Sequence, residues 1–188
     1  MAKKIRKICV TGAAGFIGFH TSKLLISKGY KVYGIDSLNS YYDVGLKKSR
    51  KKILEKSKLF TFYKFNISNK KLGILLDKIE PDVIINLAAQ AGVRHSLNKP
   101  HDYVKNNITG FLNILEYAKS KSNIPKIVYA STSSVYGANE KLPFSESDPV
   151  DHPLQFYAVT KRTNELMAHA YSNLYDVETI GLRFFTVY

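Results

Sequence analysis

The most informative segment of the chain reads Val10-Thr11-Gly12-Ala13-Ala14-Gly15-Phe16-Ile17-Gly18. It joins an apolar, β-branched run to an amphipathic pattern, so its glycines occupy a turn between a strand and a helix. Glycine in such a turn lets the backbone approach a pyrophosphate closely, and the N-terminus of the following helix offers free N–H groups. The spacing G-x-x-G-x-x-G differs from the commoner G-x-G-x-x-G fingerprint, so the segment indicates dinucleotide binding only in combination with its surroundings.

Outward from this turn, short β-branched runs alternate with longer helical patterns. Strands are predicted over 6–10, 31–36, 61–65, 83–87, 126–130 and 178–183, and helices over 15–28, 46–56, 70–79, 102–121 and 154–175. The strand residues are apolar almost without interruption, which is typical of strands covered on both faces. The sequence therefore predicts an α/β fold, a doubly wound Rossmann-type parallel sheet with helices on both faces. The polar, proline-containing residues 137–153 are predicted to form a long loop.

An acidic residue stands where a dinucleotide site needs one. Asp36 ends the second predicted strand, about 20 residues beyond the glycine turn. A carboxylate there accepts hydrogen bonds from the adenosine ribose and repels a 2′-phosphate, which favours NAD over NADP. The alternative is an ordinary aspartate in a turn after a strand, but the order strand, glycine turn, helix, strand and acid favours cofactor binding.

A second motif, Tyr157-Ala-Val-Thr-Lys161, has the spacing Y-x-x-x-K. Residues four apart on a helix share a face, so the ammonium can stand beside the phenol. It would then lower the pKa of the tyrosine from about 10. A phenolate can remove a proton from a sugar hydroxyl while hydride leaves the same carbon. Alone the spacing is common on amphipathic helices; following the dinucleotide signature, it predicts a catalytic pair.

Composition bounds the class of protein. The 188 residues, 45% of them hydrophobic, suffice for one α/β domain with a sizeable core. No apolar run is long enough to span a membrane, and the basic amino terminus lacks the long apolar stretch of a signal peptide. The one cysteine, Cys9, falls in a predicted buried strand and cannot form an internal disulfide. We therefore expect a cytoplasmic protein, and we predict neither a metal site nor a membrane partner.

The formal net charge of +13 could indicate nucleic-acid binding. The densest basic stretch is residues 47–58. It contains Ile53 and Leu54 and is followed by Leu59, and this mixture of lysines with apolar residues is typical of an amphipathic helix with a solvated face. The sequence contains no helix-turn-helix, zinc-finger or aromatic RNA-binding motif. We therefore expect no nucleic-acid partner.

These motifs together resemble the extended short-chain dehydrogenases/reductases that act on nucleotide sugars. The resemblance implies that Asp36, Ser37, Leu38, Asn39 and Ser40 surround the adenosine ribose. It implies that Asn66-Ile67 lies at the adenine, where relatives usually carry an aspartate, and that Leu87-Ala88-Ala89 and Phe184 line the cofactor. Thr132 becomes the third catalytic residue beside Tyr157 and Lys161. The NAD-binding set is then Gly12, Ala14, Gly15, Phe16, Ile17, Gly18, Asp36, Ser37, Asn39, Ser40, Asn66, Ile67, Leu87, Ala88, Ala89, Tyr157, Lys161 and Phe184.

The positions after Thr132 distinguish among reactions of this superfamily. Dehydratases and decarboxylases typically carry an acid within the next two positions, which here hold Ser133 and Ser134. The absence of an acid favours oxidation at C4, rotation of the keto-sugar and return of the hydride, which is 4-epimerisation. The stretch from Val10 to Tyr188 resembles UDP-glucuronate 4-epimerases, above all in residues 86–96, 136–139, 142–145, 149–153 and 181–188. For a UDP-sugar substrate with a C6 carboxylate we expect Ser133, Ser134 and Thr186 as partners, and Arg94 either as a further partner or as a structural ion-pair residue.

The resemblance also implies that residues 1–188 form an NAD-binding domain whose C-terminal substrate region is largely absent. Apolar faces on the helices predicted over 102–121 and 154–175 resemble those of a homodimer, or else pack against the absent segment. Three alternatives stay open: an epimerase for another UDP-sugar such as UDP-glucose or UDP-galactose, a truncated, non-catalytic NAD-binding domain, and a basic nucleic-acid-binding protein.

Overall fold

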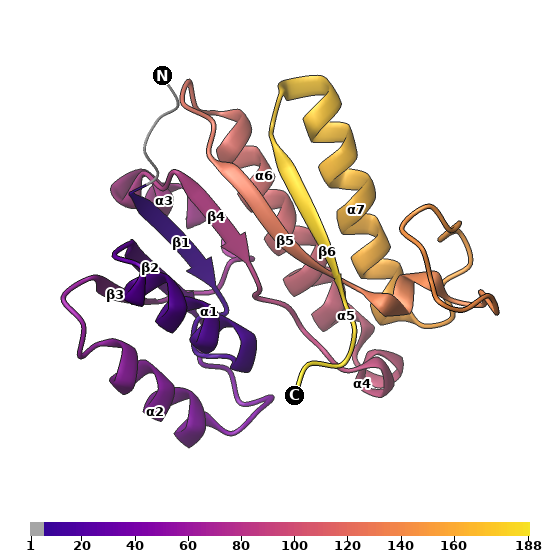
Figure 1. The fold of residues 1–188 in the computed structure, drawn as a ribbon, viewed down its shortest axis with the longest axis horizontal. Helices are drawn as coiled ribbons and strands as arrows, with labels where there is room; N and C mark the ends of the chain where they lie inside the picture. The colour runs from indigo at the N-terminus through magenta and orange to yellow at the C-terminus, as the bar shows by residue number, and fades with distance from the viewer. Residues whose placement is uncertain (1–5) are drawn as a thin grey trace.

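The computed structural model describes residues 6–188, which form a six-stranded sheet flanked by helices (Figure 1). The strands are β1 Lys7–Thr11, β2 Lys31–Asp36, β3 Phe60–Lys64, β4 Val83–Asn86, β5 Lys126–Thr132 and β6 Thr179–Phe184. The helices are α1 Phe16–Ser27, α2 Val44–Leu54, α3 Leu72–Ile79, α4 Val93–Asn98, α5 Pro100–Tyr103, α6 Gly110–Lys119 and α7 Phe156–Tyr175. A π-helical turn, η1 Val104–Thr109, and a 3₁₀ turn, η2 Ser133–Tyr136, complete the set.

The sheet has the strand order β3-β2-β1-β4-β5-β6, and every neighbouring pair is parallel. This confirms the predicted doubly wound sheet. The strands β2 and β3 lie on one side of β1, and β4, β5 and β6 lie on the other. Ligands of such sheets bind beyond the carboxyl ends of the strands, at the point where the order reverses. In this chain that point lies between β1 and β4.

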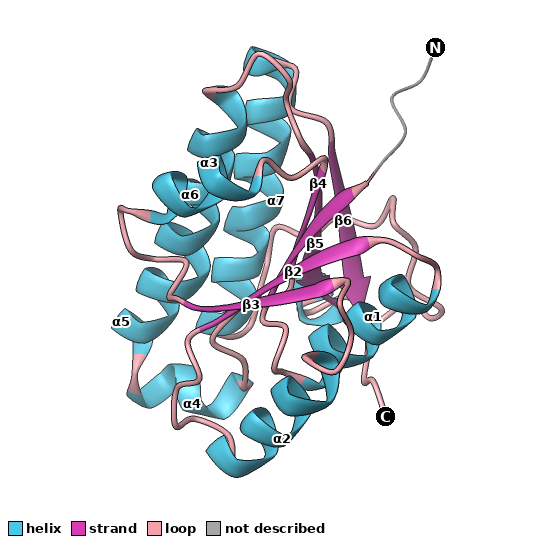
Figure 2. Cartoon of the chain, turned by 90° about the vertical axis from the view of Figure 1, so that its left-hand side faces the viewer, coloured by secondary structure: helices cyan, strands magenta, loops and turns pink. Residues whose placement is uncertain are grey.

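Two layers of helices cover the sheet, and each layer has its own core. Figure 2 shows α1 and α2 on one side of the sheet and α3, α6 and α7 on the other. Side chains alternate along β1, so Ile8 and Val10 pack in the cluster with Phe19 of α1, whereas Cys9 packs in the cluster with Phe111 of α6. Cys9 is fully buried, and its burial raises the pKa of the thiol to about 12.

Most predicted elements are confirmed, with differences at their boundaries. The helix predicted over 46–56 begins two residues earlier, because the Asp43 side chain accepts a hydrogen bond from Leu46 N at 2.6 Å and caps it. The short helix α4, which follows Gly92 at a φ of 94°, was not predicted, because six residues are too few to establish a helical period. The long loop predicted over 137–153 is confirmed, since neither helix nor strand lies between η2 and α7.

The helix predicted over 102–121 contains a π-helical turn. Within this turn the carbonyl of Asn107 accepts a hydrogen bond from Asn164 Nδ2 of α7 at 2.9 Å. The Asn107 side chain also donates to Thr160 Oγ1 at 3.0 Å and accepts from Gln90 N at 2.7 Å. Buried polar groups must find such partners, and these side-chain bonds compete with the regular helical pattern. The π turn therefore results from contacts between segments far apart in the sequence.

The basic stretch 47–58 is largely exposed, as expected, with one exception. Lys47 is only 7% exposed, and its Nζ donates to the Asn39 carbonyl at 2.9 Å and to Asn39 Oδ1 at 2.7 Å. The prediction that this lysine belongs to the solvated face of an amphipathic helix was therefore wrong at Lys47, which fixes the loop after β2. Among the helices of residues 6–188, none combines the length and apolarity needed to cross a bilayer.

Candidate active site

A cavity of about 640 Å³ opens at the carboxyl ends of the strands. Its volume is in the range of sites for small molecules and cofactors. Of the predicted site residues, the cavity is lined by Gly12, Gly15, Phe16, Ile17, Gly18, Asp36, Ser37, Asn39, Asn66, Ile67, Leu87, Ala88, Ala89, Thr132, Tyr157, Lys161 and Phe184. These residues come from the carboxyl ends of all six strands and from α1 and α7, so the fold brings distant motifs to one cavity.

The glycine turn closes tightly against the end of β4. Gly12 has a φ of 71°, and a Cβ atom on it would lie 2.9 Å from Ala88 N. A Cβ atom on Gly18 would lie 2.1 Å from the Gly12 carbonyl oxygen. No side chain caps the N-terminus of α1, where Gly15 is the N-cap residue. The first residues of α1, Phe16 and Ile17, line the cavity, so the uncapped N-terminus of this helix fits the pyrophosphate of a dinucleotide.

Asp36 is held by the backbone at the end of β2. Its Oδ2 accepts from Ala14 N at 3.1 Å and its Oδ1 from Leu38 N at 2.8 Å. An ionised carboxylate can accept about four hydrogen bonds, so capacity remains for ribose hydroxyls. Ala14 is buried and contributes through this N–H rather than by lining the cavity, and the exposed Ser40 does not line it either.

Asn66 lines the cavity with part of its side chain already engaged. Its Oδ1 accepts from both Ser68 N and Ser68 Oγ at 2.9 Å, and its Nδ2 donates to Asn106 Oδ1 at 3.4 Å. Because an amide oxygen has two lone pairs, this oxygen is fully used. Asn66 can therefore meet an adenine as a donor toward a ring nitrogen, and not as an acceptor from the amino group.

Thr132, Tyr157 and Lys161 meet at the wall formed by β5 and α7. The Thr132 hydroxyl donates to Ser134 Oγ at 3.3 Å and accepts from Ser134 N at 3.2 Å, and its contact with the Tyr157 hydroxyl acts to lower the pKa of that phenol. Lys161 is 3% exposed, and its Nζ donates to the Ala130 carbonyl of β5 at 2.7 Å. The ring of Tyr157 packs edge-on against that of Tyr103, with centroids 6.1 Å apart. The arrangement puts a phenol and a buried ammonium on the same cavity wall.

Burial has the largest influence on the pKa values of Tyr157 and Lys161. It raises the pKa of Tyr157 above its ordinary value, although the contact with Thr132 acts in the opposite direction. Burial also lowers the pKa of Lys161 to about 8. The prediction that Lys161 lowers the pKa of Tyr157 was therefore wrong for the chain by itself, because the desolvation of the phenol outweighs its stabilising contacts.

The burial of Lys161 predicts a pH-dependent stability. Because its folded-state pKa of about 8 lies below the ordinary 10.5, the ammonium destabilises the fold fully below pH 8, and the penalty disappears as the pH rises through 10.5. A depression of this size corresponds to about 3 kcal/mol. We expect the free energy of unfolding of the wild type, relative to Lys161→Met, to increase by about that amount from neutral pH to pH 10.5, as measured by urea denaturation. A difference that stays constant over this range would contradict the assignment.

The predicted substrate residues lie outside the lining of the cavity. Ser133 and Ser134 are half-buried in η2, directly beyond Thr132, where Ser134 N donates to Thr132 Oγ1 at 3.2 Å. Thr186 is exposed between Phe185 and Val187, which do line the cavity. Arg94 is exposed on α4. Their roles toward a substrate stay predictions.

The sequence reasoning missed the loop that follows β2. Tyr41 and Tyr42 line the cavity, and the ring of Tyr41 lies 4.9 Å from that of His95. The Tyr41 hydroxyl occupies the space where a Cβ atom on Gly92 would lie. The paired tyrosines next to the predicted ribose-binding acid were an available signal. The further residues that line the cavity without having been predicted are Ile35, Asp43, Leu46, Lys47, Arg50, Phe65, Ala91, Asn106, Ala130, Ser131, Phe185 and Val187.

The fold and this cavity define a doubly wound α/β protein of the dinucleotide-binding class. The chain belongs to the GDP-mannose 4,6 dehydratase family, whose sequence profile matches residues 9–188. This membership and the relatives described next confirm the resemblance to extended short-chain dehydrogenases/reductases acting on nucleotide sugars.

Several relatives match nearly the whole chain. Protein CapI of Staphylococcus aureus is 54% identical over 97% of this chain and 54% of its own length. A probable UDP-glucuronate 4-epimerase of Rhizobium meliloti is 51% identical over 95% of this chain and 52% of its own. The solved structure of UDP-glucuronic acid 4-epimerase from Bacillus cereus with UDP-glucuronic acid and NAD matches with a TM-score of 0.87 and 40% identity, over 97% of this chain and 57% of that one. The chain thus spans about half the length of the curated relatives it matches.

Proposed function

We propose that this chain carries the NAD-binding and catalytic part of a nucleotide-sugar 4-epimerase that interconverts UDP-glucuronate and UDP-galacturonate. The observation that carries the proposal is the grouping of Thr132, Tyr157 and the buried Lys161 on one cavity wall. The same cavity is bounded by a glycine turn shaped for a pyrophosphate. The relatives that bear the name UDP-glucuronate 4-epimerase, one of them solved with NAD, support the choice of reaction and cofactor.

Each residue has a defined task in this proposal. The turn from Gly12 to Gly18 would hold the pyrophosphate of NAD, and Asp36 would accept from the adenosine ribose. NAD, when bound, supplies a reversible acceptor for the hydride at C4 of the sugar. Tyr157 would take the proton of the C4 hydroxyl, and the neighbouring Thr132 hydroxyl would hold the phenol in place. The Lys161 ammonium, a buried donor beside it, would favour the ionised phenol once a substrate excludes water.

The sugar is proposed from the residues beyond Thr132. Ser133 and Ser134 offer hydroxyls where an acid would repel a C6 carboxylate, and Thr186 lies on the segment after β6 that borders the cavity. A 4-keto-uronate is a β-keto acid and can lose CO2. Hydroxyl groups that hold the carboxylate away from the cleavage geometry would suppress that loss.

Incubation with UDP-glucuronate tests the proposal, with products followed by NMR. We expect UDP-galacturonate to accumulate until an equilibrium mixture is reached, without added oxidant, because the cofactor is regenerated in each turnover. UDP-pentose as the main product would contradict the proposed carboxylate contacts, and faster conversion of UDP-glucose to UDP-galactose would reassign the sugar. NAD binding without turnover of any of these sugars would identify a non-catalytic NAD-binding domain.

The assay is best run on residues 1–188 and on a fusion that adds the C-terminal half of the Bacillus cereus relative. We propose that residues 1–188 form the cofactor-binding domain and that uridine recognition depends on a region like the part of the relatives that these residues do not cover. We also propose a homodimer, because Leu112 of α6 and Leu166 and Leu174 of α7 are exposed apolar residues. Activity of the fusion alone would support this division of tasks.

A further inference from the structure

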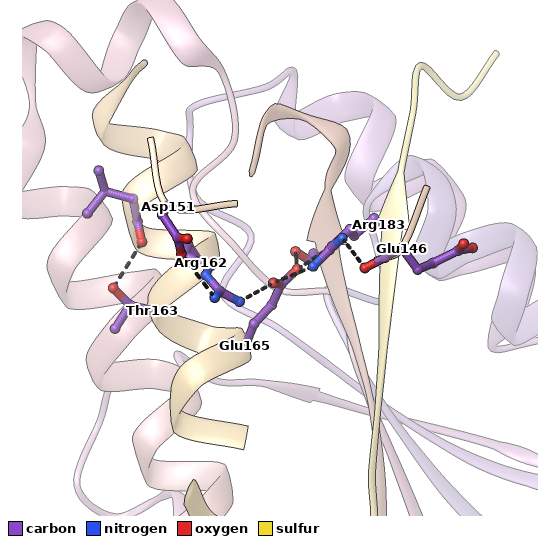
Figure 3. A network of polar contacts seen from close by, with 8 residues as sticks. Glu146, Asp151, Arg162, Thr163, Glu165 and Arg183 are labelled. Atoms are coloured by element: carbon purple, nitrogen blue, oxygen red, sulfur yellow. Dashed lines mark hydrogen bonds and ion pairs between the residues drawn. The ribbon is translucent and has the colours of Figure 1, made fainter. Parts of the chain in front are cut away.

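A carboxylate one helical turn beyond Lys161 connects the segments that carry the candidate catalytic residues. The Glu165 side chain, on α7, is 10% exposed. Its Oε1 accepts hydrogen bonds from Ser131 Oγ at 2.6 Å and from Arg183 Nε at 3.0 Å. Its Oε2 accepts from Arg162 Nη1 at 3.0 Å and from Arg183 Nη2 at 3.1 Å. Figure 3 shows Glu165 between Arg162, which lies on α7, and Arg183, which lies on β6.

The four donors use the full accepting capacity of Glu165. An ionised carboxylate offers about four lone-pair positions, so the orientation of this carboxylate is fixed. The paired bonds from Arg183 have the fork geometry in which an arginine binds both oxygens. Burial alone would raise the pKa of Glu165, but the hydrogen bonds from Arg183 and Ser131 outweigh it and hold the pKa below its ordinary value. The carboxylate therefore stays ionised at neutral pH.

The partners of Glu165 are immediate neighbours of the candidate active site. Ser131, which itself lines the cavity, precedes Thr132 on β5, and Arg183 precedes the cavity residue Phe184 on β6. Glu165 itself follows Tyr157 and Lys161 at intervals of four residues, so all three lie along one side of α7. Arg183 extends the network by donating from Nη1 to the Glu146 carbonyl at 3.4 Å.

We propose that Glu165 is a positioning residue for the epimerisation: with Ser131 and Arg183 it fixes α7 against β5 and β6 and so sets the distance between the Tyr157 hydroxyl and Thr132. This inference rests on the proposed function. Catalytic groups must be held close to their productive geometry, and a displacement of about 1 Å can cost about a hundredfold in rate. The one hydrogen bond from Ser131 is the direct link between Glu165 and the strand that carries Thr132.

Two partners of Glu165 allow a matched test. Glu165→Gln would leave two arginines facing an amide and endanger the fold itself, so the test removes one donor at a time. Ser131→Ala deletes the bond to β5 and keeps both arginines. Arg162→Met deletes a charged donor to Glu165. Arg162 lies on the same helix as Glu165, so its hydrogen bond does not connect Glu165 to a strand. Thr163→Ala, which removes only a hydrogen bond to Val159 within the helix, serves as the control.

If Glu165 is a positioning residue, Ser131→Ala should lower the activity more than Arg162→Met, whereas Arg162→Met should lower the stability more. Ser131→Ala is expected to lower kcat about tenfold with unchanged KM and NAD affinity, and Arg162→Met is expected to keep kcat within about twofold. Arg162→Met should nevertheless lower Tm more, because a charged hydrogen bond is lost. If kcat follows Tm across the variants, the network is only structural and the proposal is overturned.

A spectroscopic readout separates this inference from the proposed function. With 13Cζ-labelled tyrosine, the Tyr157 signal is assigned through Tyr157→Phe. We expect it to shift in Ser131→Ala and to keep its position in Arg162→Met and Thr163→Ala, because only the first variant removes the hydrogen bond between Glu165 and the strand that holds Thr132. If the wild type makes no UDP-galacturonate, the proposed function fails, while this comparison still decides the positioning role. An unshifted Tyr157 signal in Ser131→Ala would overturn the inference even in an active enzyme.

Discussion

Tyr157→Phe is expected to lower the rate of epimerisation by about a hundred- to ten-thousandfold, the usual contribution of a positioned acid–base group. The substitution removes one oxygen and keeps the aromatic ring, so the edge-on packing against Tyr103 persists. The phenol hydroxyl on the cavity wall beside Thr132 is lost, and with it the group that would take the proton of the sugar hydroxyl. NAD affinity should change little, because the glycine turn and Asp36 are untouched.

The measurement is initial-rate kinetics with UDP-glucuronate, together with calorimetric titration of NAD. Tyr171→Phe is the matched control: it lies on the same helix, and its hydroxyl hydrogen-bonds Glu116 outside the cavity. We expect the control to keep the wild-type rate within about twofold. Substantial epimerisation by Tyr157→Phe would remove the phenol from the mechanism.

Gly12→Val is expected to weaken NAD binding by at least about a hundredfold, which corresponds to about 3 kcal/mol. A φ of 71° is a strained backbone conformation for any residue with an L side chain. A Cβ atom here would also lie 2.9 Å from both Ala88 N and the Leu87 carbonyl carbon. Both contacts are backbone atoms, so relief requires the turn to move away from β4. Because Gly15 N donates to the Gly12 carbonyl at 2.9 Å, such a movement displaces the N-terminus of α1 as well.

Calorimetry measures the affinity, and circular dichroism establishes that the variant folds. Gly73→Ala on α3 is the control, because nothing lies within 4 Å of the added Cβ atom. We expect unchanged NAD affinity and a slight gain in stability, since alanine is the better helix former. Unchanged affinity in a folded Gly12→Val protein would place the cofactor elsewhere.

The sheet could be predicted because its determinants are local. Each strand is a short β-branched run, and alternation with helices leaves a parallel sheet as the consistent arrangement. The π turn at Asn107 could not be predicted, because the bond that diverts its carbonyl comes from Asn164, which lies 57 residues away in the sequence. The burial of Lys47 likewise depends on Asn39 in the preceding loop, whereas the periodicity of its own helix suggested a solvated lysine.

The candidate site likewise contains residues that the sequence could predict and residues that it could not. Residues within contiguous motifs, such as the glycine turn and the pair Tyr157 and Lys161, were assigned from spacing and do line the cavity. Tyr41 and Arg50 reach the same cavity through the path of the chain after β2, for which no motif was recognised. The raised pKa of Tyr157 was also out of reach, since spacing reveals a neighbouring charge but does not reveal how far water is excluded.

The burial of Cys9 provides a natural reporter of unfolding. A thiol at 0% exposure with a pKa of about 12 is protected both by packing and by its neutral state. An alkylating reagent can reach it only after β1 separates from the helical layer that includes α6. Because the chain contains one cysteine, the rate at which the alkylated protein appears in the mass spectrum reports how often β1 opens. The slowest motion of the core can thus be timed in the native protein without any engineered label.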